Sequence, residues 1–228
     1  MERNYHIAPP TFVHPDELHW RTAFHEAGHA AAIHILNRQK KLPPVFFEIH
    51  VKRPTAKNPG FVAKVIDGNL IQNLPIAIIE SLSTLTATEQ HSCQRAFEAD
   101  VVNLLVGPLS EAKYIASRDD EIFNQSLVNP TALRHYGGHS DLEKVHHYLE
   151  HFVSSKVDQE QKLTELLKQA YLFIDNCKHW KCIVELAQYI LESPKEIIGC
   201  DEAMDILDHS LLAPQHERWN NIVRFAGR

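Results

Sequence analysis

The sequence is short of positive charge, of long apolar runs and of paired cysteines, and each shortage removes a class of protein. Its 23 Lys and Arg residues are outnumbered by 29 Asp and Glu residues, which gives a net charge of -6. This balance argues against a nucleic-acid-binding module, which would carry a basic surface. No run of 18 apolar residues occurs, so no membrane helix is expected. The first residues lack the apolar core of a secretory signal, and a cytoplasmic protein is therefore expected.

The four cysteines do not form a CxxC pair. Cys177 and Cys182 are close enough in sequence to form a disulfide bond. Free thiols in a cytosolic chain are the favoured interpretation, because the cytosol keeps thiols reduced. No disulfide framework is therefore expected.

What the sequence does contain is ordinary globular composition with an excess of histidine. Hydrophobic residues make up 44% of the 228 residues and charged residues 23%, which suits one domain with a substantial core. Histidine occurs 16 times. This number raises both the chance of a metal site and the chance that a histidine motif arises by accident.

Most of the chain is predicted to be helical, with a small β element. A helix is expected over residues 15–38, because Pro15 in a first turn followed by two acidic residues is typical of a helix start. Two β-prone runs follow at 45–52 and 61–66. A helix near 75–91 and another over 93–118, kinked or interrupted at Gly107-Pro108, are expected next.

The second half is predicted to contain one long loop and then further helices. Residues 119–138 have weak periodicity and are interpreted as a functional loop. Ser140 to Glu143 matches a capping box, so a helix should begin there. Helical patterns fill 158–176, 179–192 and 200–212.

The motif that carries chemistry is His-Glu-Ala-Gly-His at residues 25–29. On a helix, His25 and His29 lie one turn apart on the same face, so both imidazoles can bind one ion. Glu26 can then act as the base toward a zinc-bound water that attacks a peptide carbonyl. The stretch around the motif is otherwise apolar, and burying these polar groups there would be costly without partners.

Several segments are similar to one known family. Residues 22–30 resemble the active-site helix of the FtsH-type ATP-dependent zinc metallopeptidases. Residues 47–53 with 60–62 are similar to the strand and glycine turn that follow it. Residues 105–112 resemble the family's Gly-Arg-x-Ala-Glu-Glu helix, and 138–143 resemble its Gly-Ala-x-x-Asp-Leu segment. Residues 186–207 are similar to its last helices.

This resemblance runs from Leu18 to Leu212 in the family's order, and it implies a zincin-like, mainly helical metallopeptidase domain. The implied ligands are His25, His29 and Asp141, because the Asp of the family's Asp-Leu segment is its third zinc ligand. From the residues alone, an acid that favours the helix dipole is the favoured interpretation of Asp141; the resemblance reverses this preference. His139 is a competing ligand, and Glu111 is a further ligand candidate or a residue that orients a ligand imidazole.

The expected organisation is one peptidase domain over residues 1–212 and a C-terminal tail. Its parts are the active-site helix (about 15–38), the β element (about 45–66), the third-ligand region (about 138–155), the C-terminal helices (about 158–212) and the tail (213–228). The remaining histidines are interpreted as ordinary surface or packing side chains, among them His34, His135, His146, His147 and His151.

The chain departs from the family in ways that bear on activity. It contains no G-x-x-x-x-G-K-[ST] loop and hence no ATPase module, and Pro108 stands where the family has Arg. We therefore expect an ATP-independent zinc endopeptidase that cleaves flexible protein segments. Two alternatives stay open: a non-catalytic zinc-binding or interaction module that keeps the fold, and a zinc hydrolase of a non-peptide amide or ester. An ATPase partner in trans and a homo-oligomer also stay open.

Overall fold

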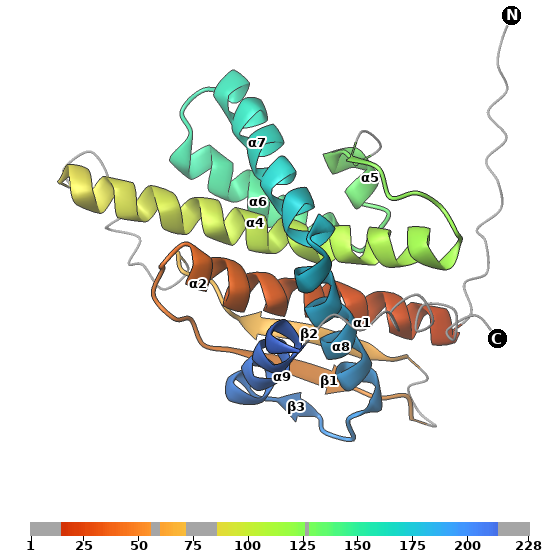
Figure 1. The fold of residues 1–228 in the computed structure, drawn as a ribbon. Coiled ribbons are helices and arrows are strands. Elements are labelled where there is room, and N and C mark those ends of the chain that lie inside the picture. Colours follow the sequence, from red (N-terminus) through yellow and green to blue (C-terminus); the bar gives the residue numbers. More distant parts are fainter. Residues whose placement is uncertain (1–14, 56–59, 72–85, 126–127, 214–228) are drawn as a thin grey trace, which may run out of the picture.

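The computed structural model describes residues 15–55, 60–71, 86–125 and 128–213, and this part of the chain is mainly helical with a small antiparallel sheet (Figure 1). Helices α1 (Pro15–Ala31) and α4 (Ala87–Arg118) pack on each other at the centre. The sheet lies on the far side of α1, and α6 and α7 lie on the far side of α4 (Figure 1). The metal motif on α1 is thus placed between the sheet and α4.

The first helix runs without a break from Pro15 to Gln39, through α1, the π-helical turn η1 (Ala32–Leu36) and α2 (Asn37–Gln39). The helix predicted over 15–38 is confirmed. The small residues of α1 are fully buried, and small side chains let α4 approach closely. Lys41 adopts a left-handed conformation with φ of 52°, and the Leu42 N–H bonds back to the Asn37 carbonyl at 2.9 Å, so the helix ends before Pro43-Pro44 as predicted.

The sheet has the strand order β2-β1-β3. Strands β1 (Phe47–Lys52) and β2 (Val62–Asp67) pair antiparallel with Phe47 opposite Asp67 and Lys52 opposite Val62. Both were predicted from their β-prone runs. The short β3 (Ile197–Ile198) completes the other side of β1, and no sequence pattern indicated it. Strand β2 therefore forms one edge of the sheet.

Helix α4 is longer and more regular than the sequence indicated. Thr86 caps its start, and Thr86 and Glu89 form a reciprocal capping box. The expected interruption at Gly107-Pro108 is wrong, because the helix continues past Pro108 to Arg118. Pro108 removes one backbone hydrogen bond, and burial of the whole stretch from Ala99 to Ala112 around it compensates. The helix expected near 75–91 falls mostly outside the described residues, and its last part belongs to α4.

The remaining helices are α5 (Pro130–Leu133), α6 (His139–Phe152), α7 (Lys156–Asp175), α8 (Cys177–Glu192) and α9 (Cys200–Leu212). The last three match their predicted patterns. The capping box at Ser140 is wrong: α6 begins one residue earlier, after Gly138, without a side-chain cap. None of the four cysteines, all of which lie in the described part of the chain, forms a disulfide bond. None of the helices in the described residues is long and apolar enough to cross a membrane.

Candidate metal centre

His25 and His29 lie one turn apart on α1 and are both buried, at 7% and 8% exposure. Their ring centroids are 4.8 Å apart and the rings meet edge to face. This arrangement follows from the four-residue spacing on a helix. The two imidazoles therefore present neighbouring nitrogen atoms on the face of α1 that α4 and α6 approach.

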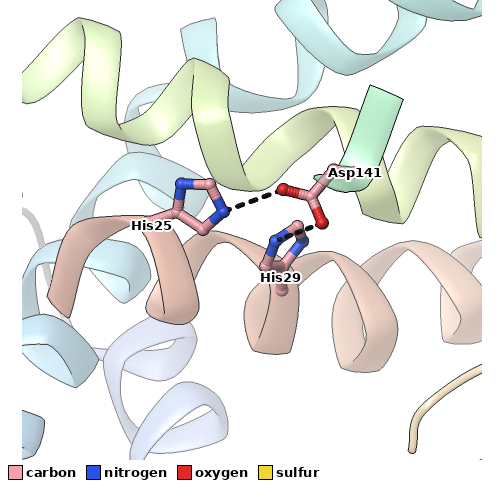
Figure 2. A group of neighbouring side chains, drawn as sticks. All are labelled: His25, His29 and Asp141. Carbon is pink, nitrogen blue, oxygen red and sulfur yellow. Dashed lines mark hydrogen bonds and ion pairs between the residues drawn. The ribbon is translucent and has the colours of Figure 1, made fainter. Parts of the chain in front are cut away.

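Asp141 joins the two histidines from the first turn of α6. Its Oδ2 lies 3.1 Å from His25 Nε2, and its Oδ1 lies 3.7 Å from His29 Nε2. Figure 2 shows both imidazoles reaching from α1 toward this carboxylate. The three possible ligand atoms all lie within 4.8 Å of one another. This buried group could hold a metal ion.

Outer contacts fix the orientation of both imidazoles. His25 Nδ1 donates to Glu111 Oε2 at 3.3 Å, and Arg21 Nε donates to the other oxygen of Glu111 at 2.8 Å. His29 Nδ1 donates to the backbone carbonyl of Asn103 at 2.8 Å. Protons held at Nδ1 leave Nε2 as the ligand atom of each ring, which is the usual arrangement behind metal-binding histidines. The residues thus fit a metal ion.

The electrostatics of the group favour a cation. Burial by itself lowers the pKa of His25, but hydrogen bonds to Asp141 and Glu111 and the nearby charge of Glu26 raise it to about 10. Burial by itself raises the pKa of Asp141, but His29 and His25 hold it well below its ordinary value. A site that binds protons this strongly is negative enough to stabilise a metal ion in their place. Two imidazoles and a carboxylate are ligands that zinc accepts.

The side chain of Asn103 ties α4 to the π-helical turn that follows the motif. With the amide oriented so that its nitrogen faces them, it donates to the carbonyls of Ala32 at 3.3 Å and Ala99 at 3.2 Å. Asn103 is 4% exposed, so these bonds satisfy a buried polar group. Since its backbone carbonyl also accepts the His29 proton, Asn103 holds both the ring and the helix that carries it. Sequence analysis did not identify this residue.

Two glycines allow close packing around the histidines. A Cβ atom on Gly107 would lie 2.3 Å from the His29 ring, and one on Gly137 would lie 3.0 Å from His25 Nδ1. Gly137 also has φ of 70°, which a residue with a side chain rarely adopts. Larger residues at either position would displace the imidazoles. The backbone at Gly107-Pro108 therefore lies close to the His29 ring, which the absence of a side chain on Gly107 allows.

Glu26 points from α1 to the edge of the sheet. Its Oε2 accepts a 2.6 Å hydrogen bond from the backbone N–H of Val65 on β2. Glu26 lines a cleft of about 360 Å³ together with the three possible ligands. The outer part of β2 and the first turn of α6 form opposite walls of this cleft. The carboxylate thus lies beside the metal group and open to a ligand in the cleft.

The structure does not bring His139 into the group. Its side chain is 66% exposed, and its Nε2 lies 3.2 Å from Glu143 Oε1 on the surface of α6. Glu111, the other alternative, contacts His25 at Nδ1, on the opposite side of the ring from Asp141. It therefore occupies an orienting position.

No family model matches the chain, and no match is found among curated proteins.

Proposed function

We propose that the chain is a zinc-dependent, ATP-independent endopeptidase of the FtsH protease-domain type, with His25, His29 and Asp141 as zinc ligands and Glu26 as the catalytic base. The observation that carries this proposal is the position of Glu26, which lines the same cleft as the buried group. The resemblance of residues 22–30 and 138–143 to that family supports it. The cytoplasmic location and any ATPase or oligomer partner remain proposals.

A zinc ion held by these three side chains would act as a Lewis acid, making water more acidic and polarising a peptide carbonyl. The chain supplies the proton acceptor. Glu26 Oε2 is held by Val65 N–H, which leaves Oε1 to accept the proton of the attacking water and pass it to the leaving nitrogen. The bond to Val65 fixes the direction of the carboxylate. Val65 is therefore a positioning residue through its backbone.

The edge of β2 supports a peptide as the substrate. Alternate residues of a strand point their backbone groups to opposite sides. Val65 directs its N–H to Glu26 and away from β1, so Ala63, two residues earlier, also turns its backbone groups to the outer edge. Both residues line the cleft. A flexible peptide can add there as a further strand, with its scissile bond next to the buried group.

The test is proteolysis by Glu26→Gln. We expect this variant to keep about one zinc per chain and to lose cleavage of a reduced, unfolded protein in the absence of ATP. The loss should be at least about 100-fold, the typical contribution of general base catalysis. Glu160→Gln, at an exposed position on α7, is the matched control and should cleave like the wild type.

The other outcomes separate the alternatives. Full activity in Glu26→Gln would refute the assignment of the base. A wild type that holds zinc but cleaves no unfolded protein would favour the non-catalytic binding module. Cleavage of small amides or esters without cleavage of any peptide would favour a different zinc hydrolase.

A further inference from the structure

The exposed face of α6 repeats the geometry of the buried histidine pair. His147 and His151 are four residues apart on α6, both exposed, with ring centroids 4.4 Å apart and an interplanar angle of 64°. The corresponding values for His25 and His29 are 4.8 Å and 72°. We propose that His147 and His151 form a second, exposed binding site for a divalent transition-metal ion.

The proton arrangement of His151 matches that of His29. His151 Nδ1 donates to the backbone carbonyl of His147 at 2.8 Å, just as His29 Nδ1 donates to a carbonyl. A proton fixed at Nδ1 leaves the His151 Nε2 lone pair to bind a metal. Since a neutral imidazole suits zinc, copper and nickel, the site should take these ions and not calcium or magnesium, which prefer oxygen ligands.

One turn earlier, Glu143 offers a third ligand. It lies four residues before His147 on the same face of the helix, and its side chain is 69% exposed. Its present partner is His139, in a surface ion pair that contributes little stability. The carboxylate can therefore turn from His139 to a metal ion at His147. An ion held across successive turns would keep the C-terminal half of α6 helical.

This site is independent of the proposed peptidase activity and differs from the buried group in accessibility. Water surrounds the exposed pair, and its two imidazoles are less constrained than His25 and His29. Its affinity for zinc should therefore be weaker than that of the buried group. His147 and His151 were interpreted from the sequence as ordinary side chains, although they have the same four-residue spacing as His25 and His29; the paired ring geometry singles them out.

The experiment is equilibrium dialysis of the full chain against Zn²⁺, with bound zinc counted per chain. We expect the wild type to bind one more zinc than His151→Ala, and His147→Ala to weaken that extra binding at least about tenfold. His146→Ala removes an exposed neighbouring imidazole from the same helix and should bind like the wild type. Equal binding by wild type and His151→Ala, or an equal loss in His146→Ala, would overturn the proposal.

A second measurement locates the ion. Substoichiometric Cu²⁺, added to zinc-loaded protein, should broaden the imidazole proton signals of His147 and His151 before those of other histidines. Broadening that begins elsewhere would contradict the site. If the buried group binds no metal, the wild type should still bind one zinc ion, and His151→Ala should bind none. Failure of the buried metal centre can therefore be distinguished from failure of this exposed site.

Discussion

At the scale of single residues, the proposed metal centre depends on a close approach that only glycine permits. Gly107→Ala places a methyl group 2.3 Å from the His29 ring, so the imidazole or α4 must move. We expect zinc affinity to fall at least about tenfold, as for other changes that misdirect a ligand histidine. The measurement is competition for zinc against a chelator of known affinity.

The control for this variant is Gly199→Ala, because a Cβ atom on Gly199 meets nothing within 4 Å. It should bind zinc like the wild type. Helix propensity alone favours Ala over Gly by about 1 kcal/mol in a helix interior. A Gly107→Ala protein that is more stable and binds zinc normally would therefore contradict the close-approach account.

The three predicted ligands lie together in the structure, and the sequence could indicate this where the information was local. The four-residue spacing of His25 and His29 determines their common face, and Glu26 is adjacent to the first of them. The family resemblance singled out Asp141, which the structure places against both histidines. Asn103 could not be found in this way. It is 74 residues from His29 and acts there through its backbone, which every residue type has.

At the scale of elements, a buried acid anchors the turn that ends β2. Asp100 on α4 is fully buried, and its carboxylate accepts hydrogen bonds from Leu70 N at 2.9 Å and Ile71 N at 2.8 Å. Burial raises its pKa to about 7, against the effect of these two bonds. The preceding residues Asp67 and Asn69 line the cleft, so Asp100 supports one wall of the site.

The raised pKa predicts a pH dependence of stability. The folded state binds the Asp100 proton more tightly than the unfolded state, so protonation of Asp100 increases the free energy of unfolding. This contribution is complete below pH 4 and is lost as pH rises through about 7. The loss amounts to at most about 4 kcal/mol. Unfolding by urea between pH 4 and 8 measures it, with Asp100→Asn as the variant that cannot titrate. If the difference in stability between the two proteins were constant over this range, the account would be wrong.

Element prediction worked for segments with strong periodicity or clear start signals. The first helix, the two longer strands and α7 to α9 all lie close to their predicted ranges. For α4 it predicted the helix and its end at Arg118 but not its start or its continuation through Pro108, where tertiary burial overrides the helix-breaking tendency of proline. It also missed β3, whose two residues become a strand only because β1 offers them a partner. Such elements depend on contacts between distant segments.

At the scale of the whole molecule, a metal ion would join α1 to α6 across α4. These helices come from distant parts of the chain, so metal binding should be coupled to folding. Zinc at 1,000 times its dissociation constant should add about 4 kcal/mol to the stability of the folded state. In a chain of this size that raises the melting temperature by on the order of 10 °C.

Thermal unfolding with zinc and with a chelator measures this coupling. The shift should become much smaller in Asp141→Asn, because Asp141 is the residue of the buried group that comes from α6. An equal shift in wild type and variant would mean that zinc stabilises the protein elsewhere.

The central claim is that His25, His29 and Asp141 hold one zinc ion, and zinc per chain in the purified protein tests it most directly. The comparison is with Asp141→Ala and with His139→Ala, an exposed neighbour on the same turn. The account predicts about one tightly bound zinc in the wild type and in His139→Ala, and a large loss in Asp141→Ala. Full occupancy in Asp141→Ala, or no zinc in the folded wild type after zinc is added back, would contradict it.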